Sequence, residues 1–165
     1  MSRTNRILLV DDDRTCLRML KKILTPLPDC EIDAFTSANI ALEKALQADY
    51  DIVISDYMMP EMDGITFLKK YIKSQPRTSR IILSSYCTKE SLYGAVNEAQ
   101  VMRYIEKPCD EHALRAIISQ VIKERVQVQP TAAARSSEML GIIQNQEHII
   151  EHQAKEIEKL KYSVA

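Results

Sequence analysis

Short apolar segments alternate with amphipathic ones along the first 125 or so residues of the chain. The apolar segments are rich in β-branched residues and too short for helices, so they predict strands. There are five of them: Ile7–Val10, Ile32–Phe35, Ile52–Ile54, Ile81–Leu83 and Met102–Ile105. Between them, apolar side chains recur at spacings of three and four, as in Leu17, Leu20 and Leu24, which predicts amphipathic helices.

This alternation of strand and helix, repeated five times, predicts a parallel sheet with right-handed crossovers and helices on both faces. Residues that favour helix N-caps stand where the helices should begin. These are Asp13, Ser37, Asp63, Thr88 and Asp110. The predicted fold class is α/β and doubly wound, and in such sheets ligands bind beyond the carboxyl ends of the strands. Function is therefore expected where the strands end.

The character of the chain changes after the fifth helix. Residues 127–137 contain Pro130, three consecutive alanines and two serines, which is typical of a linker. Beyond them apolar residues recur every seven positions: Ile143, Ile150, Ile157 and Val164. This heptad predicts a short coiled-coil-like helix, imperfect because two of the four companion positions are polar. We expect a domain over residues 1–126, a linker over 127–137 and a C-terminal helical extension over 138–165 that forms a homodimer.

Charge and composition exclude several function classes. Among the 165 residues, 22 Lys and Arg against 23 Asp and Glu leave a net charge of -1, which gives no electrostatic support for direct nucleic-acid binding. Neither a signal peptide nor an apolar run long enough for a membrane span is apparent. The four cysteines lack the paired spacing of a disulfide framework or a zinc site, so we expect a cytoplasmic protein.

Chemically active residues follow four of the predicted strands. They are Asp11-Asp12-Asp13, Asp56, Ser84-Ser85 and Lys107-Pro108. Clustered carboxylates need a compensating cation, and a site of oxygen ligands without histidine or thiolate favours Mg²⁺. A lysine and a hydroxyl beside such an ion suit the oxygens of a phosphoryl group. This edge of the sheet therefore predicts phosphoryl-transfer chemistry.

Four segments together resemble the response-regulator receiver domain of two-component signalling, over roughly residues 5–125. They are ILLVDDD at 7–13, IVISDYMMPEMDG at 52–64, IILSS at 81–85 and YIEKP at 104–108. The resemblance implies a flavodoxin-like five-stranded sheet in the order 2-1-3-4-5. It also implies that Asp56 accepts a phosphoryl group from a histidine kinase or phosphotransfer protein. Asp11 and Asp12 would hold Mg²⁺ together with Asp56 and the backbone carbonyl of Met58.

The same resemblance implies a switch. Lys107 would neutralise the phosphoryl oxygens and Ser85 would donate a hydrogen bond to one of them. The inward movement of Ser85 would be coupled to a change of rotamer at Tyr104 and would remodel the surface of the fourth helix, fifth strand and fifth helix. The Lys107-Pro108 peptide bond would be cis.

Some residues depart from the family pattern. Met58 and Cys87 are poorly suited to positioning a hydrolytic water, so we expect slow self-dephosphorylation and no other enzymatic turnover. Tyr86 would narrow access for small phosphodonors. The connection over residues 98–103 lacks the usual glycine.

Other functions are open at this point. The domain could be a scaffold whose partner surface does not depend on phosphate, or the regulatory part of a longer protein with an output domain beyond residue 165. The segment His148–His152 matches a zinc-protease pattern, but it falls on outward heptad positions, which favours a solvated helix face. A redox role for Cys87 and Cys109 has no evident partner thiol to support it.

Overall fold

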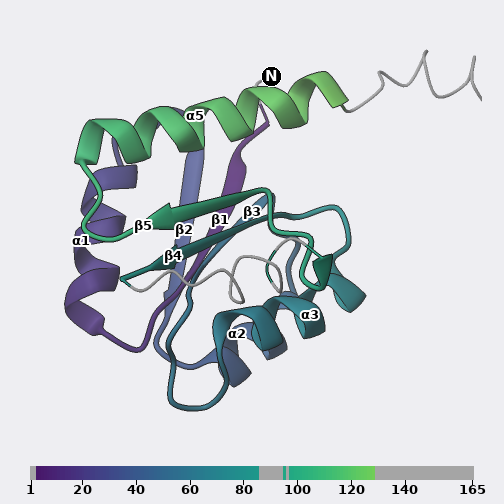
Figure 1. Cartoon of the computed structure of the whole chain (residues 1–165). Coiled ribbons are helices and arrows are strands. Elements are labelled where there is room, and N and C mark those ends of the chain that lie inside the picture. The colour runs from purple at the N-terminus through teal and green to yellow at the C-terminus, as the bar shows by residue number, and fades with distance from the viewer. Residues whose placement is uncertain (1–2, 86–94, 96, 129–165) are drawn as a thin grey trace, which may run out of the picture. The chain divides into compact units, whose positions relative to one another are not determined.

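The computed structural model describes residues 3–85, 95 and 97–128. Its centre is a five-stranded parallel sheet in the order β2-β1-β3-β4-β5, which confirms the order expected from the sequence (Figure 1). The strands are β1 (Asn5–Val10), β2 (Cys30–Phe35), β3 (Ile52–Asp56), β4 (Ser79–Ser84) and β5 (Arg103–Glu106).

Helices cover both faces of the sheet. Those with described bounds are α1 (Arg14–Leu24), α2 (Ala38–Ala45), α3 (Gly64–Ser74) and α5 (Glu111–Val128). Figure 1 shows α1 and α5 against one face and α2 and α3 against the other. This arrangement is the doubly wound fold that the alternation of strand and helix predicts.

The helices begin at predicted caps. The carboxylates of Asp13 and Asp63 accept hydrogen bonds from the first-turn amides of α1 and α3, at 2.7 and 2.9 Å. Ser37 Oγ accepts from Ile40 N at 3.3 Å, and Asp110 Oδ1 accepts from two amides of α5 at 2.9 Å. These contacts satisfy donors that a helix leaves unpaired. The fifth predicted cap, Thr88, lies outside the described residues.

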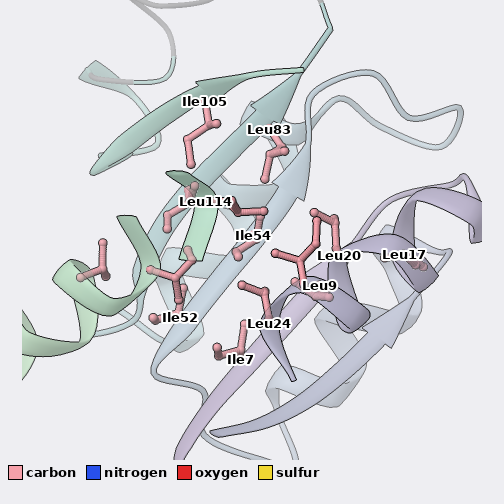
Figure 2. Packing of buried hydrophobic residues seen from close by; sticks show 14 residues of the cluster. Ile7, Leu9, Leu17, Leu20, Leu24, Ile52, Ile54, Leu83, Ile105 and Leu114 are labelled. Atoms are coloured by element: carbon pink, nitrogen blue, oxygen red, sulfur yellow. The ribbon is translucent and has the colours of Figure 1, made fainter. Parts of the chain in front are cut away.

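Alternate side chains of each strand enter two separate apolar clusters. Ile7, Leu9, Ile54 and Leu83 face α1 and α5, whereas Leu8, Val53 and Ile82 face α2 and α3. Figure 2 shows the first cluster, in which Leu17, Leu20 and Leu24 of α1 meet the strand residues. Both clusters are fully buried at their centres, as expected of a sheet with helices on both faces.

Three strands, β1, β2 and β4, begin earlier than their apolar runs. Asn5 and Arg6 pair with Cys30 and Glu31 at the start of the β1–β2 ladder. Their side chains are polar or partly exposed, so the apolar pattern does not include them. Backbone pairing needs no apolar side chain, which is why hydrophobic patterning underestimates strand length here.

The connection before β5 lacks a glycine, and its backbone is held instead by hydrogen bonds from an arginine side chain. Gln100 has a φ of 49°, in the left-handed region that favours glycine. The guanidinium of Arg80 donates from Nε to the carbonyl oxygens of Ala99 at 2.9 Å and of Gln100 at 3.3 Å. A buried arginine thereby fixes a turn that the sequence left undefined.

The chain divides into two compact units, Met1–Ile122 and Lys123–Ala165, and little of the second is described. The expected linker over 127–137 lies almost wholly outside the described residues. The helical extension over 138–165, its heptad positions and the His148–His152 segment lie entirely outside them. Within the part of the chain that the structure describes, no helix combines the length and apolar character that crossing a membrane requires.

Candidate functional site

Three charged side chains meet at the carboxyl edge of the sheet. Lys107 Nζ donates to Asp11 Oδ2 at 2.7 Å and to Asp56 Oδ1 at 2.6 Å. Asp11 is only 3% exposed and Asp56 only 9%, and the Lys107 side chain is 17% exposed. The ammonium of Lys107, after β5, thus joins two nearly buried carboxylates that lie at the ends of β1 and β3.

The backbone around each residue fixes this geometry. Asp11 follows β1, and its Oδ1 accepts from Asp13 N at 2.9 Å. Asp56 is the last residue of β3 and its Oδ2 accepts from Met58 N at 2.8 Å. Lys107 follows β5, its N donates to Ser84 O at 2.8 Å, and its bond to Pro108 is cis, as expected. Parallel strands that end at one edge therefore deliver all three groups to one point.

Burial and ion pairing act in opposite directions on these groups. Burial raises the pKa of the Asp56 carboxyl, while the hydrogen bond and the charge of Lys107 lower it and the nearby Asp11 raises it. Burial would lower the pKa of Lys107, but the hydrogen bonds to Asp11 and Asp56 outweigh it and raise the pKa above its usual value. The lysine therefore stays charged at neutral pH and supplies the site's fixed positive charge.

The same edge fits a divalent cation. One carboxylate oxygen from each of Asp11, Asp12 and Asp56 lies within 4.8 Å of the others. Asp12 is exposed and faces the solvent from which an ion and its waters would come. A donor set of carboxylate oxygens suits a hard ion such as Mg²⁺, so these residues fit the group that the sequence predicts.

The remaining predicted site residues lie around this centre. Met58 is the second residue of the loop after Asp56 and is 65% exposed. Ser85 follows β4 directly and is exposed. Tyr104 is half-buried on β5 and packs against the cluster under α2 and α3. The structure thus places Met58 and Ser85 at strand ends beside the charged centre, and their roles there stay predictions.

Two neighbours of the site were missed by sequence reasoning about chemistry. Cys16, in the first turn of α1, has a thiol whose pKa is raised to about 12 by burial and by its hydrogen bond with Asp11. Gly64 begins α3, and a Cβ there would lie 2.2 Å from the backbone oxygen of Asp56. The spacing of Cys16 from Asp11 could have suggested the first, because α1 begins at Arg14, three residues after Asp11, and its first turn lies beside the end of β1.

The fold and this edge define a doubly wound α/β domain with a site suited to a divalent cation and an anionic group. The chain matches the family model of the response regulator receiver domain over residues 7–119. It therefore belongs to the response regulator receiver domain family of two-component signalling.

Curated relatives support the same assignment. The chain is 32% identical over 165 residues to a protein-glutamate methylesterase/protein-glutamine glutaminase of Caldanaerobacter subterraneus, covering 98% of this chain and 44% of that protein. It is 32% identical over 123 residues to the regulatory protein AtoC of Escherichia coli, covering 74% of this chain and 26% of AtoC. The chain thus spans less than half the length of these relatives.

Solved structures agree with the fold. A signal receiver domain of an HD domain-containing protein from Pseudomonas fluorescens has a TM-score of 0.72 and 31% identity, covering 77% of this chain and 93% of that domain. A CheY-like receiver domain protein from Methanospirillum hungatei has a TM-score of 0.71 and 28% identity, covering 76% and 98%.

Proposed function

We propose that this chain is a phosphoryl acceptor that takes a phosphoryl group from a histidine kinase or phosphotransfer protein onto Asp56. The observation that supports this most strongly is the Lys107 ammonium, 2.6 Å from Asp56 Oδ1 and 2.7 Å from Asp11 Oδ2. It provides a cation beside a nucleophile, which is what transfer of an anionic group requires.

In the proposed reaction, a carboxylate oxygen of Asp56 attacks the phosphorus of a phosphohistidine in line with the bond to nitrogen. The new oxygen–phosphorus bond gives an aspartyl phosphate, and the nitrogen–phosphorus bond breaks to return a histidine. Lys107 neutralises the phosphoryl oxygens, and Ser85 donates to one of them. The amide of Met58, bonded to Asp56 Oδ2 at 2.8 Å, keeps the carboxylate oriented.

Asp11, Asp12 and Asp56 would hold Mg²⁺ with the backbone carbonyl of Met58. When bound, the ion supplies positive charge that offsets repulsion between the carboxylates and the incoming phosphoryl group. Because Lys107 already bonds two of these carboxylates, its ammonium would have to share them with the ion.

We further propose that phosphorylation shifts Ser85 and Tyr104 and thereby changes a partner surface near β5.

Self-dephosphorylation should be slow, because the exposed thioether of Met58 is a weak acceptor that orients water poorly. The chain would then act as a long-lived signal rather than an enzyme with turnover. We also propose a cytoplasmic location, because the four cysteines lack the paired spacing of a disulfide framework.

The test is incubation with Mg²⁺ and a phosphorylated histidine kinase, followed by intact mass measurement. The wild type should gain the mass of one phosphoryl group, and Asp56→Ala should gain none. Asp49→Ala, which removes an exposed acid just before β3 and so at the other end of that strand from Asp56, is the matched control and should be phosphorylated like wild type.

A result without phosphorylation of the wild type, with either the kinase or acetyl phosphate, would favour the phosphate-independent scaffold. Equal phosphorylation of Asp56→Ala would show that another residue is the acceptor. Following the decay of the phosphorylated mass also measures the lifetime that Met58 is proposed to prolong.

A further inference from the structure

Glu61 links the loop after β3 to a different element of the fold. Its Oε2 accepts a hydrogen bond from Ser37 Oγ at 3.0 Å and another from Asn39 N at 3.1 Å. Both donors belong to the start of α2, and both hydrogen bonds lower the pKa of the Glu61 carboxyl. A carboxylate from the site loop thus rests on the N-terminus of α2.

The start of α2 is suited to such a contact. Backbone N–H groups in the first turn have no acceptor within the helix, and the helix dipole favours negative charge there. The first turn of α2 contains no acidic residue of its own. Ser37 satisfies the amide of Ile40, and Glu61 satisfies the amide of Asn39. Glu61, in the loop after β3, therefore supplies the negative charge that the first turn of α2 lacks.

The loop that carries Glu61 is fixed at both ends by the site. Tyr57 N donates to Leu83 O at 3.2 Å, and Gly64 N donates to Tyr57 O at 2.8 Å. Met58 N also donates to Asp56 Oδ2 at 2.8 Å, and Met59 and Met62 pack against the apolar cluster under α2 and α3. Glu61 adds the hydrogen bonds from this stretch to α2. The contact between Glu61 and α2 therefore adds to these anchors and helps to set the position of the Met58 carbonyl.

We propose that Glu61 is a positioning residue that holds the Met58 carbonyl in place for Mg²⁺ and couples the ion site to the N-terminus of α2. This inference rests on the proposed function, in which that carbonyl is a ligand. Coupling between two sites is reciprocal. Mg²⁺ binding should therefore strengthen the bond between Glu61 and the amide of Asn39, and α2 becomes a second element, besides β5, that responds to events at Asp56.

The test uses the full chain as wild type, Glu61→Ala and Glu61→Gln. Isothermal titration calorimetry measures the Kd for Mg²⁺, and hydrogen exchange followed by NMR measures the amide of Asn39 with and without the ion. Glu61→Ala should raise the Kd roughly two- to fivefold, the effect of one or two exposed charged hydrogen bonds. It should also abolish the slowing of Asn39 exchange by Mg²⁺, and Glu61→Gln, which keeps an acceptor oxygen, should restore part of both.

Glu43→Ala is the matched control, because Glu43 is an exposed glutamate on α2 itself. It should change neither the Kd nor the exchange of Asn39. An unchanged Kd and unchanged Asn39 protection in Glu61→Ala would overturn this inference alone, as would a lowered Tm with an unchanged Kd. If the wild type bound no Mg²⁺, both this inference and the proposed ion site would fall.

Discussion

Lys107 neutralises two carboxylates that would otherwise repel each other across a nearly buried space. Its Nζ is within 2.7 Å of both Asp11 and Asp56, and each partner is less than a tenth exposed. Removing one member of such a group leaves the other charges uncompensated, which costs more than the interaction itself contributes. The residue is thus expected to matter for stability as well as for phosphoryl transfer.

We predict that Lys107→Met lowers the free energy of unfolding by roughly 2–4 kcal/mol at pH 7 without metal. Because Asp11 and Asp56 then lack their cation, added Mg²⁺ should restore more stability to the variant than it adds to the wild type. Urea denaturation with and without Mg²⁺ measures both effects.

Lys69→Met is the control for that experiment. Lys69 also pairs with a carboxylate, that of Glu98, but both side chains are about half exposed. An exposed pair contributes little, so this variant should stay within about 0.5 kcal/mol of wild type. A Lys107→Met protein as stable as wild type in the absence of metal would contradict the role assigned to the ion pairs.

The sequence places the acidic residues and the lysine at strand ends, and the rule that parallel strands end at one edge is enough to expect Asp11, Asp56 and Lys107 together. It does not predict that Lys107 bonds both carboxylates at once, because that depends on side-chain reach. The contacts of Glu61 cannot be predicted from the sequence either, because its partners, Ser37 and Asn39, precede it by more than twenty residues.

At the scale of elements, α3 begins so close to β3 that only a glycine fits at its first position. A Cβ on Gly64 would lie 2.2 Å from Asp56 O and 3.0 Å from Ile82 Cδ1. The backbone φ of Gly64 is ordinary, so the requirement is for space rather than for a left-handed conformation. Gly64 thereby sets the distance between α3 and the backbone of Asp56.

We predict that Gly64→Ala lowers the free energy of unfolding by about 1–3 kcal/mol, because the added methyl group must displace the start of α3 or the end of β3. Urea denaturation measures the loss, and the rate of phosphorylation should fall with it. Lys70→Ala, at an exposed position of the same helix, should have almost no effect on either. Equal stability of the two variants would show that the contact relaxes without cost.

The elements themselves were largely predictable. Apolar runs located all five strands, and cap residues located the starts of four helices, because both signals are local. The polar starts of β1 and β2 were not predictable from apolar patterning, since cross-strand pairing of Asn5 and Arg6 with β2 defines them. The turn at Gln100 was not predictable either, because a distant arginine on β4 holds it.

At the scale of the whole molecule, folding raises the pKa values of buried thiol and phenol groups. These groups therefore stay protonated in the folded state at a pH where they ionise in the unfolded chain. Burial, aided by the hydrogen bond to Asp33, raises the pKa of Tyr50 from 10.0 to about 12. Burial raises that of Cys16 from 9.0 to about 12. Between the unfolded-state and the folded-state pKa of each group, the folded state binds more protons than the unfolded state. The free energy of unfolding therefore falls as pH rises.

We therefore predict a declining free energy of unfolding between about pH 9 and about pH 12. Urea denaturation at a series of pH values measures the slope. Tyr50→Phe has no phenol to ionise and should show a shallower decline, even though it also loses the 2.8 Å bond to Asp33 and starts from a lower stability. A wild-type stability that is constant across this range would contradict the prediction.

The C-terminal heptads give a prediction for assembly. An isolated amphipathic helix of this length is marginal in water, so we expect residues 138–165 of two chains to pair in parallel through Ile143, Ile150 and Ile157. Sedimentation at tens of micromolar should show a dimer, and Ile150→Asp should convert it to a monomer. A wild-type monomer under these conditions, phosphorylated or not, would contradict the pairing.

The sheet separates two apolar layers that share almost no side chains, one under α1 and α5 and the other under α2 and α3. Substitutions on opposite sides should have additive energetic effects, because residues without common neighbours rarely influence one another. Each layer can then accumulate changes on its own while the rim that bears Asp56 is preserved. A substitution in one layer should therefore leave the packing of the other layer, and the position of Asp56 at the edge between them, largely unchanged.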